Sequence, residues 1–200
     1  YLTNKNCKSG SERIASVINE LINDFWEVSG KNNYLINNEK LKQTLVINVQ
    51  ADQPFLDPNV LSKMYEFFIS QNQIPEVVTP IYKLHENDIH NTSVVKTLIN
   101  NNGKAIYFSR TAIPFIRDID KRDWYKHYNY WGHVGIYGYR ADILSNWFNY
   151  PFSELEKSEK LEQLKLIDSG VEINTFEVKG DFLSVDTKED LIRARLWSKK

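Results

Sequence analysis

Apolar residues follow the chain in two patterns, a helical spacing of three to four residues and short unbroken runs typical of buried strands. Two segments with helical spacing, 14–25 and 60–68, each follow a helix-start signal. Ser9-Gly10-Ser11-Glu12 has the form of a capping box, and Asp57-Pro58 supplies an N-cap and a first-turn proline. Helices are also expected over 141–148, 158–168 and 188–197, whereas polar residues 30–42 are expected to form a loop.

Strand-like runs separate these helices. They cover 44–49, 76–81, 94–99, 104–108, 134–139 and 172–178. Asn102-Gly103 between the third and fourth runs is a strong hairpin signal. The alternation of strands and helices predicts an α/β fold: a mixed, mostly parallel, Rossmann-like sheet with helices on both faces and an antiparallel hairpin insertion.

The composition of the chain bears on its number of domains, its partners and its disulfides. Two hundred residues with 42% hydrophobic content can bury one full core, so a single domain over 1–200 is expected. The 25 Lys and Arg against 26 Asp and Glu, without a dense basic run, argue against nucleic-acid partners. The apolar runs are too short to span a membrane, and the first residues do not resemble a signal peptide, so a cytoplasmic protein without membrane partners is expected. Cys7 is the only cysteine, which excludes an intrachain disulfide.

Two aspartates are the first candidates for chemistry. Asp52 and Asp186 each follow a strand-like run and precede a helix signal. A parallel sheet would carry both to the rim at the carboxyl ends of its strands, where α/β proteins bind ligands. Two carboxylates there suit Mg²⁺, which fills its other positions with water and substrate phosphate. The alternative is structural, with Asp52 capping a turn and Asp186 capping the last helix.

Several segments of the chain match the motifs of one known family. Residues 48–54 (NVQADQP) resemble that family's NVQGDEP, and residues 9–13 (SGSER) resemble its SGTER. The other matching segments are YFSR at 107–110 with IP at 113–114, HVGIYGYR at 133–140, LEQL at 161–164, and VDT with EDL at 185–191. The matches occur in family order and cover essentially the whole chain, which therefore resembles the CMP-Kdo synthetases, or 3-deoxy-manno-octulosonate (Kdo) cytidylyltransferases.

The resemblance implies an Mg²⁺-dependent transfer of CMP from CTP to Kdo, giving CMP-Kdo and pyrophosphate for lipopolysaccharide or capsule synthesis, by a homodimer. Asp52 and Asp186 would hold the metal, and Arg110 would pair with the sugar carboxylate, because a guanidinium matches a carboxylate bidentately. These three are the expected catalytic residues. The expected substrate contacts are Ser9, Gly10, Arg13 and Gln50, with Arg110, His133, Tyr137, Glu162 and Gln163 toward the sugar.

The residues taken singly allow simpler interpretations. Ser9 could be only a helix cap, and Arg13 only a solvated helix residue. Arg110 could form a surface salt bridge, and His133 could pack in the core. Glu162 and Gln163 could face solvent on a helix.

The departures from the family pattern leave two other functions open. Ala51, Gln53 and Lys165 replace the family's glycine, glutamate and arginine, which allows a related sugar acid such as 8-amino-Kdo as substrate. The family's N-terminal Arg- and Lys-bearing loop, which binds the CTP triphosphate, has no match in these residues. The chain is therefore expected to be shortened at its N-terminus and not to bind CTP at micromolar concentration alone. A non-catalytic sugar-binding or dimerisation module is the third possibility.

Overall fold

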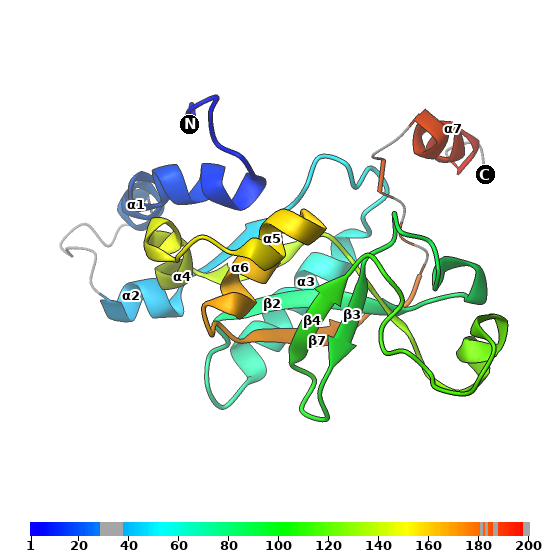
Figure 1. Ribbon diagram of the computed structural model, residues 1–200. Helices are drawn as coiled ribbons and strands as arrows, with labels where there is room; N and C mark the ends of the chain where they lie inside the picture. The colour runs from blue at the N-terminus through cyan, green and yellow to red at the C-terminus, as the bar shows by residue number, and fades with distance from the viewer. Residues whose placement is uncertain (29–37, 181, 183, 186–187, 198–200) are drawn as a thin grey trace.

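The computed structural model describes residues 1–28, 38–180, 182, 184–185 and 188–197. These residues form one seven-stranded sheet with helices packed on it (Figure 1). The strands are β1 (Leu45–Asn48), β2 (Val77–Lys83), β3 (Lys96–Ile99), β4 (Ala105–Ser109), β5 (Trp131–His133), β6 (Tyr137–Arg140) and β7 (Ile173–Glu177). Their order is β1-β6-β2-β5-β3-β4, and β7 pairs with β2 as well.

Within the described residues, seven α-helices and three 3₁₀ segments precede, connect or follow the strands. The helices are α1 (Gly10–Val28), α2 (Asn38–Gln43), α3 (Pro58–Ser70), α4 (Ala141–Ser145), α5 (Glu154–Glu159), α6 (Gln163–Asp168) and α7 (Lys188–Trp197). The 3₁₀ segments are η1 (Glu86–Asp88), η2 (Lys121–Lys126) and η3 (Trp147–Asn149). The expected α/β class is therefore confirmed. No helix in the described part of the chain is both long and apolar enough to cross a membrane.

The strand directions correct one part of the prediction. Only β2 and β7 pair in parallel, and every other pairing among the described strands is antiparallel. The expectation that most neighbouring strands pair in parallel is thus wrong, because the antiparallel strand β6 lies between β1 and β2. Since β6 runs against both neighbours, β1, β2 and β7 still point the same way. Their carboxyl ends therefore meet at one rim.

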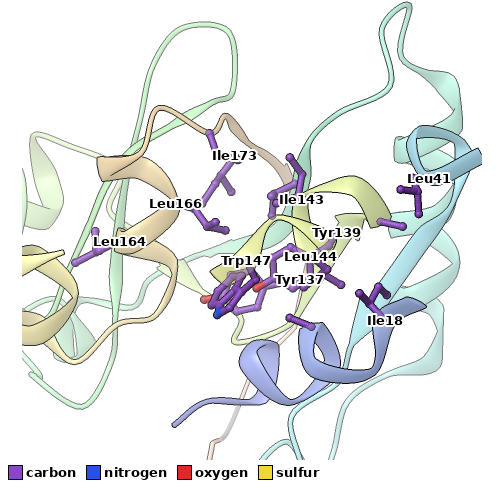
Figure 2. Close-up of a cluster of buried hydrophobic side chains, with 14 of the residues drawn as sticks. Ile18, Leu41, Tyr137, Tyr139, Ile143, Leu144, Trp147, Leu164, Leu166 and Ile173 are labelled. Atoms are coloured by element: carbon purple, nitrogen blue, oxygen red, sulfur yellow. The ribbon is translucent and has the colours of Figure 1, made fainter. Parts of the chain in front are cut away.

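Helices cover both faces of the sheet, as predicted. On one face, α1, α2, α4 and α6 pack on a cluster of aromatic and aliphatic side chains that includes Tyr137, Tyr139 and Trp147. Figure 2 shows these three rings beside Ile18 of α1. On the other face, α3 contributes Val60, Met64 and Phe68 to a second cluster. Alternation along β2 explains the division, because Val77 joins the first cluster and Val78 the second.

The local signals place most elements correctly. Asp57 caps α3 by accepting from the Asn59 amide (2.9 Å), and the hairpin forms between β3 and β4 with Gly103 at φ +73°. Residues 38–43 form α2 and not the expected loop.

Three expected elements are each replaced by two shorter ones with different bounds. The strand expected over 134–139 begins only at Tyr137, as β6, and residues 131–133 form the separate strand β5; residues 131–133 pair with the end of β2 and residues 138–139 with its start. In place of the helix expected over 158–168 there are α5, which begins at Glu154, and α6, and Lys160 ends α5 in a left-handed conformation at φ 54°. The helix over 141–148 becomes α4 followed by η3.

Candidate functional site

A cleft of about 1490 Å³ opens at the carboxyl ends of β1 and β2. Its walls come from the start of α1, the β1–α3 loop, the β2–β3 connection, β5, and the α5–α6 region. Nine residues expected to act in binding or catalysis line it: Ser9, Gly10, Gln50, Asp52, Arg110, His133, Tyr137, Glu162 and Gln163. Segments distant in the sequence thus converge on one concave site, the usual form of a small-molecule site.

The start of α1 forms one wall of the cleft. The Ser9 hydroxyl accepts from the Glu12 amide (3.1 Å), and the Glu12 carboxylate accepts from the Lys8 amide (2.9 Å), which is close to the expected capping box. A Cβ at Gly10 would lie 3.1 Å from Asn48 Nδ2, so glycine permits the close approach of α1 to β1. Ser9 is therefore both a helix cap and a residue of the cleft wall.

Ser11 is the centre of a buried polar network beneath this wall. Its side chain is fully buried, and its hydroxyl donates to Glu162 Oε1 (3.0 Å). Because a serine hydroxyl has one hydrogen, Ser11 Oγ must accept from the Tyr139 hydroxyl (2.7 Å) and from Asn48 Nδ2 (3.1 Å). Gln50 Nε2 also donates to Glu162 Oε1, at 3.4 Å. The network joins α1, β1, β6 and the residue that precedes α6, and it fixes the position of the Glu162 carboxylate.

Three buried polar atoms on the cleft have no partner within the described residues. They are Asp52 Oδ1, Glu162 Oε2 and Gln163 Nε2. Gln163 is 2% exposed, which is inconsistent with the solvent-facing alternative for this residue. Buried polar groups in native proteins are almost always hydrogen-bonded, so unpartnered ones beside a cleft indicate a place for a polar ligand.

Asp52 lies beside the segment that follows β7. Its Oδ2 accepts from the Ser184 hydroxyl (3.0 Å), and its main-chain oxygen accepts from the Val185 amide (3.0 Å). The two strand ends are therefore adjacent, as the prediction of a shared site requires. Asp186 itself lies outside the described residues. Within the described ranges, no group of three His, Cys, Asp or Glu residues could hold a metal alone.

His133 and Tyr137 are near each other although the expected continuous strand is broken. Their ring centroids are 5.2 Å apart. His133 Nε2 lies 2.9 Å from Thr79 Oγ1, which also lies 2.8 Å from the Ile136 carbonyl. When Thr79 donates its one hydrogen to that carbonyl, His133 Nε2 carries the ring proton and Nδ1 is left as an acceptor. Burial lowers the pKa of His133 to about 3 and raises the pKa of Tyr137 well above its usual value, so both side chains are neutral near pH 7.

Arg110 follows β4 directly, as the hairpin predicted. Its Nε donates to the Glu159 carbonyl (2.9 Å) and its Nη1 to the Thr92 carbonyl (3.3 Å). Nη2 has no hydrogen-bonding partner among the described residues. The guanidinium is thus held by main-chain oxygens and retains a donor for a ligand in the cleft.

Arg13 is the expected contact that the structure places away from the cleft. Its guanidinium donates to Thr3 Oγ1 and to the carbonyls of Asn4 and Cys7. These bonds attach the N-terminal segment to α1. In this arrangement Arg13 supports the segment that leads into Ser9, and its contact with a substrate stays a prediction.

Sequence reasoning missed three residues that organise the site. Ser11 lies within the SGSER segment, but only the folded structure brings it to Glu162 and Tyr139. Lys96 and Glu159 fix the position of Arg110 through its main chain. Lys96 left one signal, since it is a charged residue inside the apolar run 94–99.

Comparisons with known proteins agree with this geometry. The family described as cytidylyltransferase matches residues 1–173. A 3-deoxy-manno-octulosonate cytidylyltransferase of Thermodesulfovibrio yellowstonii is 31% identical over 95% of this chain and 69% of its own length. The enzyme of the same name from Cytophaga hutchinsonii is 38% identical over 74% of this chain and 59% of its own length, so the chain spans less than two thirds of that relative.

A solved structure gives the same result. The structure of CMP:2-keto-3-deoxy-manno-octonic acid synthetase complexed with CTP is 29% identical, with a TM-score of 0.76, covering 100% of this chain and 71% of that chain. The expected resemblance is confirmed. The chain belongs to the cytidylyltransferase family, and within it to the 3-deoxy-manno-octulosonate cytidylyltransferases.

Proposed function

We propose that the protein transfers CMP from CTP to Kdo, forming CMP-Kdo and pyrophosphate. The names of its relatives and the CTP complex of its structural neighbour support this reaction. The observation that carries it in this chain is the set of unpartnered buried atoms of Asp52, Glu162 and Gln163 on one cleft. Two oxygens and one amide nitrogen there match a ligand rich in hydroxyl and metal-bound phosphate groups.

The reaction requires positioning more than covalent help from the protein. The anomeric hydroxyl oxygen of Kdo forms a bond to the α-phosphorus of CTP, the bond from that phosphorus to the bridging oxygen breaks, pyrophosphate leaves, and the hydroxyl proton is released. Neutral His133 offers Nδ1 as an acceptor for a sugar hydroxyl. Glu162 Oε2 can accept from a second hydroxyl, and Gln163 Nε2 can donate to a sugar oxygen. Holding both reactants in line removes most of the entropy cost of their encounter.

Arg110 is assigned to the carboxylate of Kdo. Its Nε and Nη1 are already engaged by carbonyls, so the side chain is held in place before the ligand binds. A charge-assisted bond from Nη2 then adds affinity at small entropic cost.

Asp52 fits a magnesium ion, since its Oδ1 is a buried carboxylate oxygen that lacks a partner. Mg²⁺ uses one or two carboxylates together with water and phosphate oxygens, so a larger cluster of ligands is not required. By the family resemblance Asp186 is the second ligand. When bound, the ion would offset negative charge on the triphosphate. Lipopolysaccharide or capsule synthesis, a cytoplasmic location and a homodimer belong to the same proposal.

The test is the pair of variants D52N and D57N in the full-length gene product, assayed by pyrophosphate release from CTP with Kdo and MgCl₂. We expect D52N to lower kcat by roughly 100-fold or more, since metal ligation contributes several kcal/mol to the transition state. Asp57 is exposed and outside the cleft, and asparagine is an equally good helix cap, so D57N should behave as the wild type.

Each other outcome identifies what is wrong. Equal activity of the two variants would refute the metal assignment. Faster turnover of 8-amino-Kdo than of Kdo would show that the amino-substituted sugar acid is the substrate. Binding of the sugar acid without any nucleotide transfer would favour the non-catalytic module.

A further inference from the structure

Lys96 is a fully buried lysine at the start of β3. Its Nζ donates to three main-chain carbonyls, those of Asn91 (2.8 Å), Val94 (2.7 Å) and Arg110 (2.5 Å). A lysine ammonium has three hydrogens, so all its donors are used and no carboxylate is among its hydrogen-bonding partners. Burying a charge in this way is costly, and an apolar residue would fill the same position more cheaply.

The positions of the three acceptors indicate a use for the charge. Asn91, Val94 and Arg110 all line the cleft. The first two belong to the turn before β3, and the third follows β4. One ammonium therefore ties together two separate loops that form the same wall.

Glu159 completes the arrangement from the other side. Its Oε2 accepts from the Arg110 amide (3.0 Å), and its Oε1 accepts from the Ser109 hydroxyl (2.7 Å). Its main-chain oxygen accepts from Arg110 Nε (2.9 Å). Arg110 is thus fixed at its carbonyl by Lys96 and at its amide and Nε by Glu159.

We propose that Lys96 is a positioning residue, which together with Glu159 holds Arg110 and the 91–94 turn in the one arrangement that presents the Arg110 guanidinium to the carboxylate of a sugar acid. The choice of ligand rests on the proposed function. The positioning itself is a property of the described contacts. Lys96 does not touch the ligand, and its effect passes through Arg110.

The ammonium makes this arrangement sensitive to pH. Burial lowers the pKa of Lys96 to about 8, with Arg110 lowering it as well, whereas the carboxylates of Glu159 and Asp88 act in the opposite direction. The ammonium of Lys96 therefore loses its proton near pH 8. A neutral amine has two hydrogens, so above this pH one of the three bonds must be lost.

Kinetics of K96M in the full-length gene product test the link to the ligand, and K104M is the matched control. Lys104 lies on the same hairpin, outside the cleft, and its ammonium pairs with exposed Glu172. We expect K96M to raise KM for Kdo about tenfold, the effect of weakening one hydrogen bond to a charged group, and to leave KM for CTP within about twofold. In the variant K96M/R110A, KM for Kdo should not exceed that of R110A alone, because residues that act as a unit are not additive.

Backbone amide resonances of Arg110 and Thr111 in the wild type test the positioning without any assay of activity. They should titrate with a midpoint near pH 8, and the same resonances of K104M should do so too. In K96M the amide resonances of Arg110 and Thr111 should no longer shift with pH around pH 8. If K96M does not fold, the wild-type titration still decides.

The outcomes separate the two proposals. Amides that do not titrate, or additive effects of K96M and R110A, would overturn the positioning role. If the amides titrate but R110A leaves KM for Kdo unchanged, Lys96 remains a positioning residue. The assignment of Arg110 to the sugar carboxylate is then refuted.

Discussion

Replacing Ser11 by alanine is the sharpest test of how the cleft is held together. The substitution removes one oxygen from a fully buried position. That oxygen donates to Glu162 and accepts from Tyr139 and Asn48. Two donors from separate elements would lose their acceptor, and the Glu162 carboxylate would lose its nearest donor.

The magnitude follows from these three bonds. A hydrogen bond to a charged group contributes about 1.5–3 kcal/mol, and each buried donor left unsatisfied costs about 1–3 kcal/mol. Partial rearrangement of the partners prevents the full sum of these costs. We therefore expect S11A to lower the free energy of unfolding by about 2–4 kcal/mol, a large part of the roughly 5–15 kcal/mol that stabilises a typical domain.

Urea unfolding followed by circular dichroism measures this change, with S16A and S11T as controls. Ser16 lies on the same helix, is exposed, and donates only to the Arg13 carbonyl (2.7 Å), so S16A should stay within about 0.5 kcal/mol of the wild type. S11T keeps the hydroxyl and should recover most of the stability. An S11A variant as stable as S16A, with the same dependence on urea, would refute the reasoning.

Two further predictions concern the segment at β5. A Cβ at Gly132 would lie 2.5 Å from Leu84 Cδ2 and 2.6 Å from Tyr82 Cζ, so G132A should lower the free energy of unfolding in urea by about 1–3 kcal/mol. In the control variant G135A the new Cβ would meet no atom closer than 3.6 Å, so its stability should stay unchanged. Equal effects of the two substitutions would contradict the packing argument. The pKa of His133 is lowered to about 3, so the unfolded chain binds more protons between pH 3 and 6.5 and stability falls as the pH falls through this range. From pH 7 to 5 the wild type should lose about 1–2 kcal/mol more than H133N, and identical losses would show that the imidazole is not neutral in the fold.

Local signals in the sequence were sufficient for much of the fold. The caps of α1 and α3 and the hairpin at Gly103 are encoded by residues next to one another, so the sequence predicts them correctly. The break between β5 and β6 has no such signal, because residues 134–139 (VGIYGY) form an unbroken strand-like run in the sequence. It arises from pairing with the two ends of β2, which is a tertiary event.

The candidate site divides in the same way. Residues in short motifs, such as Asp52, His133 and Glu162, could be named from the sequence and line the cleft. Ser11 and Lys96 could not, because their roles depend on partners that lie far away along the chain or at main-chain oxygens. A sequence pattern records side-chain types, and it does not record which carbonyls a buried ammonium will meet.

The left-handed turn at Lys160 has a consequence for two glutamates. In an uninterrupted helix, Glu159 and Glu162 would be three positions apart and would present like charges on one face, about 5–6 Å apart. The interruption turns them in different directions: Glu159 serves Ser109 and Arg110, and Glu162 serves Ser11. A conformation that costs a non-glycine residue about 1–2 kcal/mol thus relieves a charge repulsion and lets the end of α5 and the start of α6 each hold a different part of the site.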